Sequence, residues 1–246
     1  DNNVMKEHEN LYDKIEEIFG KNPGKLNILE QKIDIGLQME YFECSRKMAS
    51  EYDECWAIEQ SDYLMDTRYP TDLKKRILAR LATIDRVECY RTIESYLSNP
   101  DDELKDWAAL SFYESKMHLL GEILDENQIF ISTGLGGKHH KLRYFVVLIE
   151  RNRKELNKIQ QRIIKSEMNY VFKKYDAEIE KVQFSGFLTT VILLLPLQFA
   201  IKQMFQEIID ECNLYGDFLK DNFIVTNVKL LSFNEIRDFI ERKQDK

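Results

Sequence analysis

The first half of the chain places its apolar residues three or four positions apart, which is the spacing of amphipathic helices. Residues 4–19 follow this pattern, and a drifting apolar stripe continues it through residues 25–60. Tyr69-Pro70-Thr71-Asp72 is typical of a helix start, and a second helix is predicted over Val87 to Leu97. Residues 1–125 are therefore predicted to be all-helical.

The segment Ser98-Asn99-Pro100-Asp101-Asp102 is the sharpest local pattern in this half. Asn99 is suited to a helix cap, and proline is favoured at the first helical position. The two aspartates would then lie in the first turn, where the helix dipole stabilises negative charge. A helix that continues towards Leu124 is predicted after this turn.

Residues 87–112 resemble a HEAT repeat, with an apolar helix, an Asn-Pro-Asp turn and a second helix that contains an Ala-Ala pair. The matching positions are Ile93, Leu97, Asn99, Pro100, Asp101, Leu104, Ala108, Ala109 and Leu110. The HEAT-like region would extend over residues 70–124, although Lys105 stands where the family commonly has Arg. The resemblance implies stacked antiparallel helix pairs and a binding surface, and it transfers no functional residues.

After residue 125 the apolar pattern becomes strand-like. Residues 128–133 (QIFIST) and 142–149 (LRYFVVLI) are predicted to form a hairpin around a Gly-rich loop. Further on, the pattern predicts a charged helix over 150–175 with Ile159 and Tyr170 among its core residues, strands over 178–185 and 187–195, a helix over 198–213, a strand over 225–231 and a terminal helix from Asn234.

From Leu142 onwards, this order of elements is similar to that of a ferredoxin-like sandwich, in which two helices cover one face of an antiparallel sheet. The predicted fold class is α+β, with a HEAT-like helical domain over residues 1–125 and a ferredoxin-like domain over 126–246. Such a likeness in element order says almost nothing about activity.

The run Val182 to Ile201 contains no charged residue and is long enough to span a bilayer. Turn formers such as Gly186 and Pro196 interrupt it, and it is rich in β-branched residues. These features favour a buried strand followed by a turn over a membrane helix. We therefore expect no membrane partner.

Charged residues are distributed unevenly along the 246 residues, whose formal net charge is −8. Residues 1–125 hold 16 Lys and Arg against 27 Asp and Glu, whereas residues 126–246 hold 19 against 16. The overall acidity argues against a protein whose whole surface follows phosphate backbones. The four cysteines match no zinc or disulfide pattern, so a cytoplasmic protein without metal or cofactor is expected.

The most distinctive candidate site is the Gly-rich loop before Arg143. Its tentative ligand-binding residues are Gly136, Gly137, Lys138, His139, His140, Lys141 and Arg143. Glycine N–H groups with Lys and His side chains would suit an anion, although the spacing is not that of a P-loop. A solvated hairpin loop and a metal site are the alternatives, and adjacent histidines make a shared metal awkward.

The sequence contains no recognisable catalytic signature, so it favours a non-catalytic protein that binds a protein partner through its helical surface as an interaction or scaffold module. One alternative is binding of an anionic ligand (a nucleotide, a phosphorylated metabolite or, less favoured, nucleic acid) through loop 133–143. Another is an enzyme with an interdomain cleft. The sequence determines neither the partner nor the oligomeric state.

Overall fold

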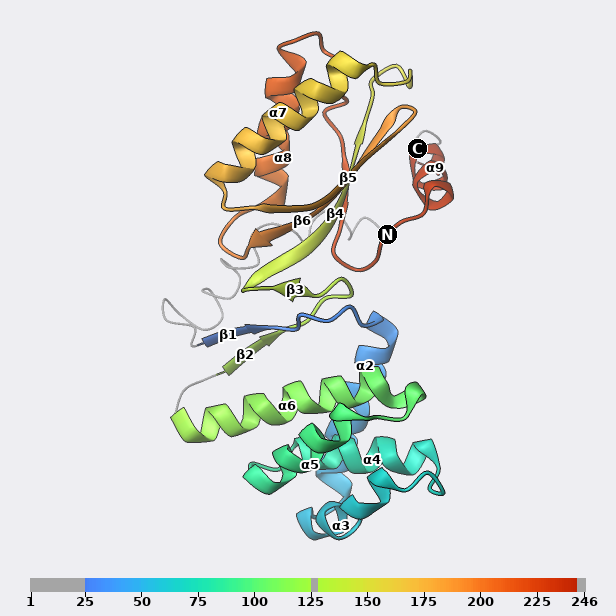
Figure 1. Cartoon of the computed structure of the whole chain (residues 1–246), viewed down its shortest axis with the longest axis vertical. Helices are drawn as coiled ribbons and strands as arrows, with labels where there is room; N and C mark the ends of the chain where they lie inside the picture. The colour runs from blue at the N-terminus through green and yellow to red at the C-terminus, as the bar shows by residue number, and fades with distance from the viewer. Residues whose placement is uncertain (1–24, 125–127, 243–246) are drawn as a thin grey trace. The chain divides into compact units, whose positions relative to one another are not determined.

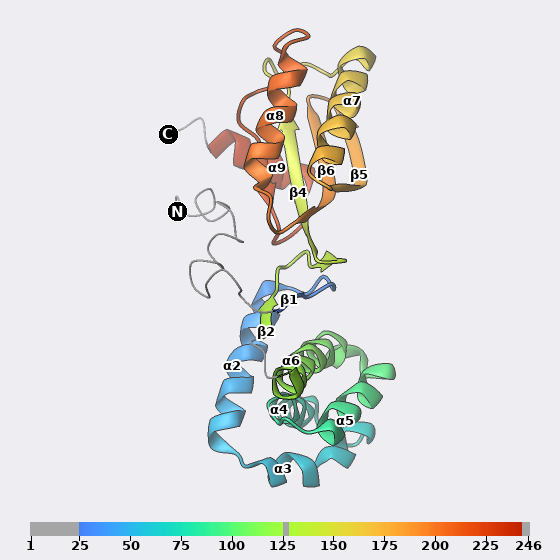
Figure 2. The ribbon, with the colours of Figure 1, turned by 90° about the vertical axis from the view of Figure 1, so that its left-hand side faces the viewer.

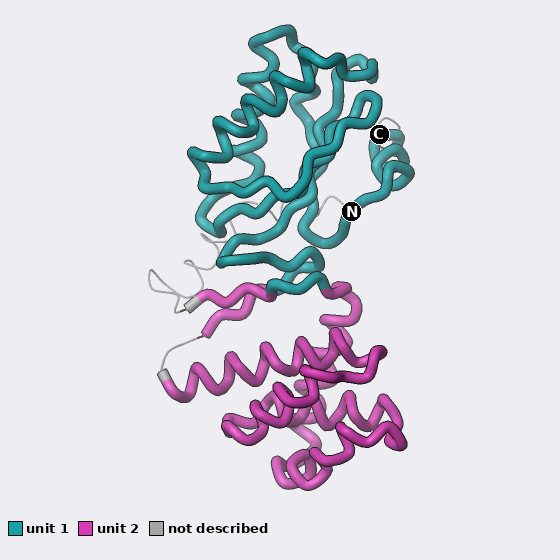
Figure 3. Tube along the Cα trace, in the orientation of Figure 1, with its two compact units in different colours: residues 1–22, 30–32, 132–246 teal, residues 23–29, 33–131 magenta. Residues whose placement is uncertain are grey.

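The structure, a computed structural model, describes residues 25–124 and 128–242. It divides into a helical unit of residues 23–29 and 33–131 and an α+β unit of residues 1–22, 30–32 and 132–246 (Figure 3). The helix predicted over residues 4–19 lies outside the described residues. The predicted domain boundary was 125/126, and these units divide at 131/132.

The helical unit contains most of the helices that the sequence predicts. Its helical elements are α2 (Ile35–Glu51), α3 (Glu54–Glu59), η1 (Ser61–Met65), α4 (Thr71–Ala82), α5 (Val87–Ser98), η2 (Asp102–Leu104) and α6 (Lys105–Leu124). Tyr41, Ile77 and Trp107 are fully buried in its core. The Trp107 indole N–H donates to the Lys75 carbonyl at 3.0 Å, which satisfies the polar atom of the buried ring.

A parallel pair of short strands completes this unit, and it corrects two predictions. β1 (Lys25–Ile28) pairs with β2 (Gln128–Ile131), so residue 25 begins a strand and not a helix. For the same reason the prediction that residues 128–133 form a hairpin with 142–149 was wrong. Local periodicity identified β2 as a strand but carried no information about a partner a hundred residues away.

The turn before α6 also differs from its predicted role. Asn99 is the C-cap of α5 and does not begin the next helix. Asp101 makes no side-chain cap hydrogen bond. Its carboxylate instead accepts hydrogen bonds from Lys74 Nζ at 2.5 Å and from Tyr96 Oη at 2.8 Å. The buried Lys74 ammonium needs a counter-charge, which the Asp101 carboxylate supplies, whereas a helix end can be satisfied by solvent.

The α+β unit is built around one antiparallel sheet. Its elements are β3 (Gly137–Lys138), β4 (Lys141–Ile149), α7 (Lys158–Lys174), β5 (Glu178–Ser185), β6 (Leu188–Pro196), α8 (Ile201–Asn213), β7 (Ile224–Thr226) and α9 (Phe233–Arg242). The strand order is β3-β4-β6-β5, and β7 also pairs with β4. The uncharged run therefore forms strands on either side of a turn at Gly186, as predicted.

Helices cover both faces of this sheet. Figures 1 and 2 show α7 and α8 on one face and α9 on the other. All nine residues of β4 are consequently buried, which explains why β4 is apolar in sequence without strict alternation. The described chain is thus an α+β protein with a helical part followed by a sheet, and within it no helix is both long and apolar enough to cross a membrane.

Candidate functional site

The glycines of the predicted loop are needed for close packing. A Cβ on Gly134 would lie 1.8 Å from the Val228 carbonyl oxygen. Gly136 has a φ of +65° and would meet the backbone of Gln31 at 2.4 Å. The Gly136 N–H donates to the Thr133 carbonyl at 3.1 Å, so this amide is already used within the loop. Close backbone packing and the positive φ of Gly136 therefore explain why glycine occupies these positions.

The two cations at the start of β4 are held by carboxylates. Lys141 Nζ donates to Glu178 at 2.8 Å and lies 3.0 Å from the Asp176 carboxylate. Arg143 makes a bidentate pair with Glu180 at 2.6 and 2.8 Å. The hydrogen bonds from Arg143 lower the pKa of Glu180. Burial lowers the pKa of Lys141, but its hydrogen bonds to Glu178 and Asp176 outweigh this effect and raise it. Both cations are therefore largely neutralised.

The remaining predicted residues form the tip of the β3–β4 hairpin. His139 and His140 occupy the two turn positions with φ of 50° and 62°, between the paired residues Lys138 and Lys141. Two left-handed residues in a two-residue loop define a type I′ turn. Lys138 and both histidines are exposed. Of the predicted site, these three side chains are the ones available to a ligand.

A second group of cations lies on α7, and the sequence prediction missed it. Lys158, Arg162, Lys165 and Lys173 are exposed and recur three to eight residues apart. With 3.6 residues per turn they fall within an arc of about 80° and span about 22 Å of helix. We call these residues the α7 cation row. The periodicity of cations at 158, 162 and 165 is the pattern that would have revealed it.

Packing of the apolar face of α7 determines where this row points. Asn157 caps the helix, and a capping box with Gln160 fixes its start. The buried residues are Ile164, Met168, Val171 and Phe172. Ile159 and Tyr170, which were predicted to face the core, are 69% and 70% exposed. The helix is thus rotated from the predicted phase, and Tyr170 is exposed on the same helix as the cations.

Among the described residues, no member of the α7 cation row forms an ion pair. Lys174 behaves differently, because Glu207 of α8 accepts hydrogen bonds from its ammonium at 2.8 and 2.9 Å. Lys165 lies 5.4 Å from the centre of the Phe184 ring, a cation–π contact that leaves its charge unneutralised. The row therefore presents uncompensated positive charge to solvent.

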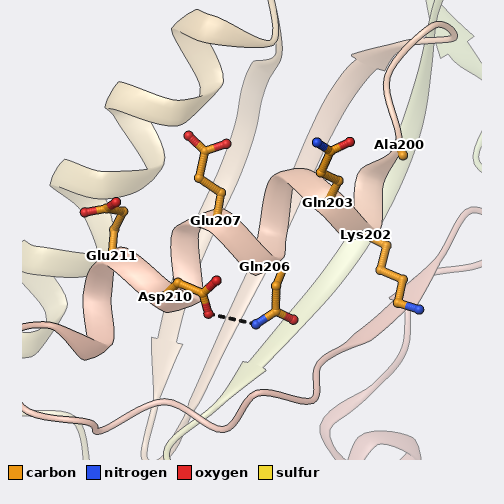
Figure 4. Close-up of a pocket in the computed structure, with 7 residues that line it drawn as sticks. All are labelled: Ala200, Lys202, Gln203, Gln206, Glu207, Asp210 and Glu211. Atoms are coloured by element: carbon orange, nitrogen blue, oxygen red, sulfur yellow. Dashed lines mark hydrogen bonds between the residues drawn. The ribbon is translucent and has the colours of Figure 1, made fainter.

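The exposed side of α8 has the opposite charge. A shallow groove of about 560 Å³ is lined there by Ala200, Lys202, Gln203, Gln206, Glu207, Asp210 and Glu211, which belong to α8 and to the residue that precedes it (Figure 4). Gln206 donates to Asp210 at 2.9 Å. Because α7 and α8 pack against each other, the helical layer carries a basic side and an acidic side. Within this helical layer, an anionic ligand would be attracted to the α7 side.

Among the described residues, metal-ligating side chains are not grouped in a comparable way. In the parts of the chain that the structure describes, no three His, Cys, Asp or Glu side chains are grouped to hold a metal ion. His118 lies at the surface, 3.5 Å from Asp85. Burial raises the pKa of Cys89 to about 11 and that of Cys212 to about 12, so neither thiol is a ready nucleophile.

Comparison with known proteins finds no matching family model and no matching curated protein. Two solved structures show a partial likeness. The REP-associated tyrosine transposase bound to a REP hairpin is 15% identical, with 41% of this chain and 61% of that chain covered and a TM-score of 0.32. A protein given the name transposase, from Deinococcus radiodurans R1, is 14% identical, with 44% and 94% covered and a TM-score of 0.37.

These neighbours contradict the predicted non-catalytic scaffold, because both carry the name of a transposase. The protein partner that the scaffold implied is likewise unsupported. TM-scores of 0.32 and 0.37 indicate a distant likeness, which assigns no activity to this chain.

Proposed function

We propose that the α+β unit binds the phosphate backbone of nucleic acid along α7. The observation that supports this is the α7 cation row, Lys158, Arg162, Lys165 and Lys173, which has no ion-pair partner among the described residues. Uncompensated cations on one face of a helix are the electrostatic footprint of such an interface.

The dimensions of the row suit a repeating polyanion better than a single phosphate. The cations extend over about 22 Å of helix, so no small anion reaches all of them. A nucleic acid presents a phosphate every few ångströms and releases condensed counterions as each one is neutralised. The exposed Tyr170 adds an aromatic surface beside the charges.

The test is equilibrium binding of the whole chain to fluorescent DNA and RNA oligonucleotides, single-stranded and duplex, by anisotropy. Replacing Lys158, Arg162, Lys165 and Lys173 together by Gln is expected to weaken binding by about 10- to 100-fold, which corresponds to about 0.35–0.7 kcal/mol for each of the four exposed contacts.

The matched control removes the same charge from the helical unit. Arg46, Lys47, Lys105 and Lys116 are exposed there and form no ion pair among the described residues. Their replacement by Gln gives the same net charge but is expected to change binding by less than about threefold, because these residues do not belong to the proposed contact and exposed charges are screened by salt. Equal loss in both variants, or no binding by the intact chain, would overturn the proposal.

Two finer assignments of fold accompany this function. The order β7-β4-β6-β5, with two helices on one face, supports a ferredoxin-like sandwich for the α+β unit. The mutual packing of α4, α5 and α6 supports a HEAT-like arrangement around residues 87–112. A structure-based alignment of the two units, each taken alone, against experimental structures of those folds would test both.

A further inference from the structure

A small pocket lies between α9 and the end of the sheet, on the face opposite α7 and α8 (Figure 1). Its volume is about 170 Å³. Five of its lining residues are apolar, namely Ile149, Phe223, Ile224, Phe239 and Ile240. The three isoleucines are buried members of the core that α9 shares with β4 and β7. The floor of the pocket is therefore apolar and fixed by core packing.

Two cations, Arg153 and Lys220, line the same pocket, and the backbone holds both at the end of β4. The Arg153 N–H donates to the Glu150 carbonyl at 3.2 Å, and the Lys220 N–H donates to the Ile149 carbonyl at 2.9 Å. The Arg153 side chain is exposed and that of Lys220 is half-buried. Two segments about 70 positions apart in sequence thus bring their cations to one place.

Neither cation is neutralised by the fold. Among the described residues, Arg153 and Lys220 form no ion pair and no side-chain hydrogen bond. The carboxylates of the segment that carries Lys220 are already engaged, because Arg151 pairs with Asp217 at 2.8 Å and with Asp221 at 3.3 Å. The pocket therefore combines an apolar floor with two uncompensated positive charges.

The remaining acidic groups nearby do not compete for these cations inside the pocket. Glu150 follows Ile149 in extended chain, and successive residues there point to opposite faces of the sheet. Its carboxylate is buried and accepts a hydrogen bond from the Lys154 N–H at 2.7 Å. Asp238 and Glu241 of α9 are exposed and do not line the pocket.

We propose that this pocket binds a small monocarboxylate whose apolar part is a single aromatic ring. An apolar cavity of about 150 Å³ accommodates benzene, so this pocket has room for one ring and little more. The carboxylate would lie between Arg153, whose guanidinium suits it bidentately, and Lys220. Pockets for larger ligands such as nucleotides usually exceed about 300 Å³. The site is separate from the α7 cation row and goes beyond nucleic-acid binding.

The experiment titrates benzoate into the full ¹⁵N-labelled chain near pH 7, at constant ionic strength, and follows amide chemical shifts. We expect a Kd of about 0.1–1 mM for a ligand of this size, with shift changes at Ile149, Ile224 and Ile240. Acetate lacks the ring and benzyl alcohol lacks the charge. Each should bind at least about fivefold more weakly than benzoate.

Arg153→Gln with Lys220→Gln is expected to weaken benzoate binding by about 5- to 30-fold and to leave benzyl alcohol binding within about twofold. The matched control is Lys154→Gln with Arg237→Gln. These two residues are exposed nearby, do not line the pocket and form no ion pair among the described residues. The control should change benzoate binding by less than about twofold.

Ile240→Phe narrows the pocket and should weaken benzoate and benzyl alcohol alike. Circular dichroism verifies that this variant folds. If it does not fold, the Arg153 and Lys220 variant decides the question, because neither of its substitutions removes an interaction of the core.

Several outcomes would overturn the inference. Benzoate that binds no better than benzyl alcohol, or that shifts only residues outside the pocket, would show that the cations and the apolar floor do not act together. Equal losses in the cation variant and its control would attribute binding to general charge. If the cation variant kept its benzoate affinity but lost oligonucleotide affinity, Arg153 and Lys220 would belong to the nucleic-acid interface. Replacement of the α7 cation row should leave benzoate binding unchanged, so the two proposals fail separately.

Discussion

Lys74 is almost fully buried in the helical unit, and its ammonium is neutralised by Asp101. Removing one partner of such a pair leaves an uncompensated buried charge. We expect Asp101→Asn to lower the free energy of unfolding by about 2–4 kcal/mol. Both tryptophans, Trp56 and Trp107, belong to this unit, so urea unfolding followed by tryptophan fluorescence reports on it.

The neighbouring Asp102 is exposed and provides the control, with an expected change within about 0.5 kcal/mol for Asp102→Asn. The hydrogen bond from Lys74 lowers the pKa of Asp101. The contribution of the Asp101 carboxylate to stability is therefore present above the unfolded pKa near 3.9 and is lost as the pH falls through the lower folded pKa. Equal effects of both substitutions would mean that the Lys74 pair is unimportant.

Glu114 is a carboxylate with the opposite pH behaviour. It accepts hydrogen bonds from Tyr41 at 2.5 Å and Ser45 at 2.9 Å, but burial dominates and raises its pKa. The folded state then holds the proton more tightly than the unfolded state. Stability should therefore fall as the pH rises from about 4.3 through the raised folded value.

Glu114→Gln should flatten this dependence, whereas Glu122→Gln, exposed on the same helix, should retain it. Urea midpoints from tryptophan fluorescence between about pH 4 and 7 would measure the effect. A Glu114→Gln variant with the same slope as the intact protein would show that another group titrates.

At the scale of elements, the phase of α7 was the main error. Apolar residues occupy more than one side of this helix, since Ile159 and Tyr170 lie on a different face from Ile164 and Met168. Periodicity alone could not choose between the two faces. Packing in the folded unit decides which face is buried, and the buried face is the one that contains Phe172. By contrast, β5 and β6 were predictable because the Gly186 turn separates them clearly in sequence.

The β3–β4 turn leads to a stability prediction for the α+β unit. Replacing His139 by Asn and His140 by Gly should relieve left-handed strain at both positions and stabilise the hairpin by about 1–2 kcal/mol. Hydrogen exchange of the β4 amides would detect the change as slower exchange. The matched variant is Gly186→Ala, which places a Cβ at a φ of +59° in open space and should destabilise by a similar amount through strain alone. Unchanged or faster exchange in the Asn-Gly variant would indicate that the histidines make stabilising contacts of their own.

At the scale of the whole molecule, sequence patterns revealed the change of architecture near residue 125 and the shift in charge that accompanies it. They could not reveal which cations remain unpaired, because that depends on contacts between distant residues. Arg143 and Glu180 are 37 positions apart, as are Lys141 and Glu178. The sequence analysis therefore assigned ligand binding to loop cations that the fold neutralises, and it missed the α7 cation row.

The chain as a whole is acidic, so its binding to a polyanion should depend on local charge and hence on salt. With four cations in contact, the slope of log K against log salt concentration should be about −3 for single strands and −4 for duplexes. Each single replacement in the α7 cation row should reduce this slope by about one unit and weaken binding similarly for different sequences. Titrations at several salt concentrations near neutral pH would measure both. A slope near zero would mean that binding does not involve phosphate contacts, since those release counterions whatever the net charge of the protein.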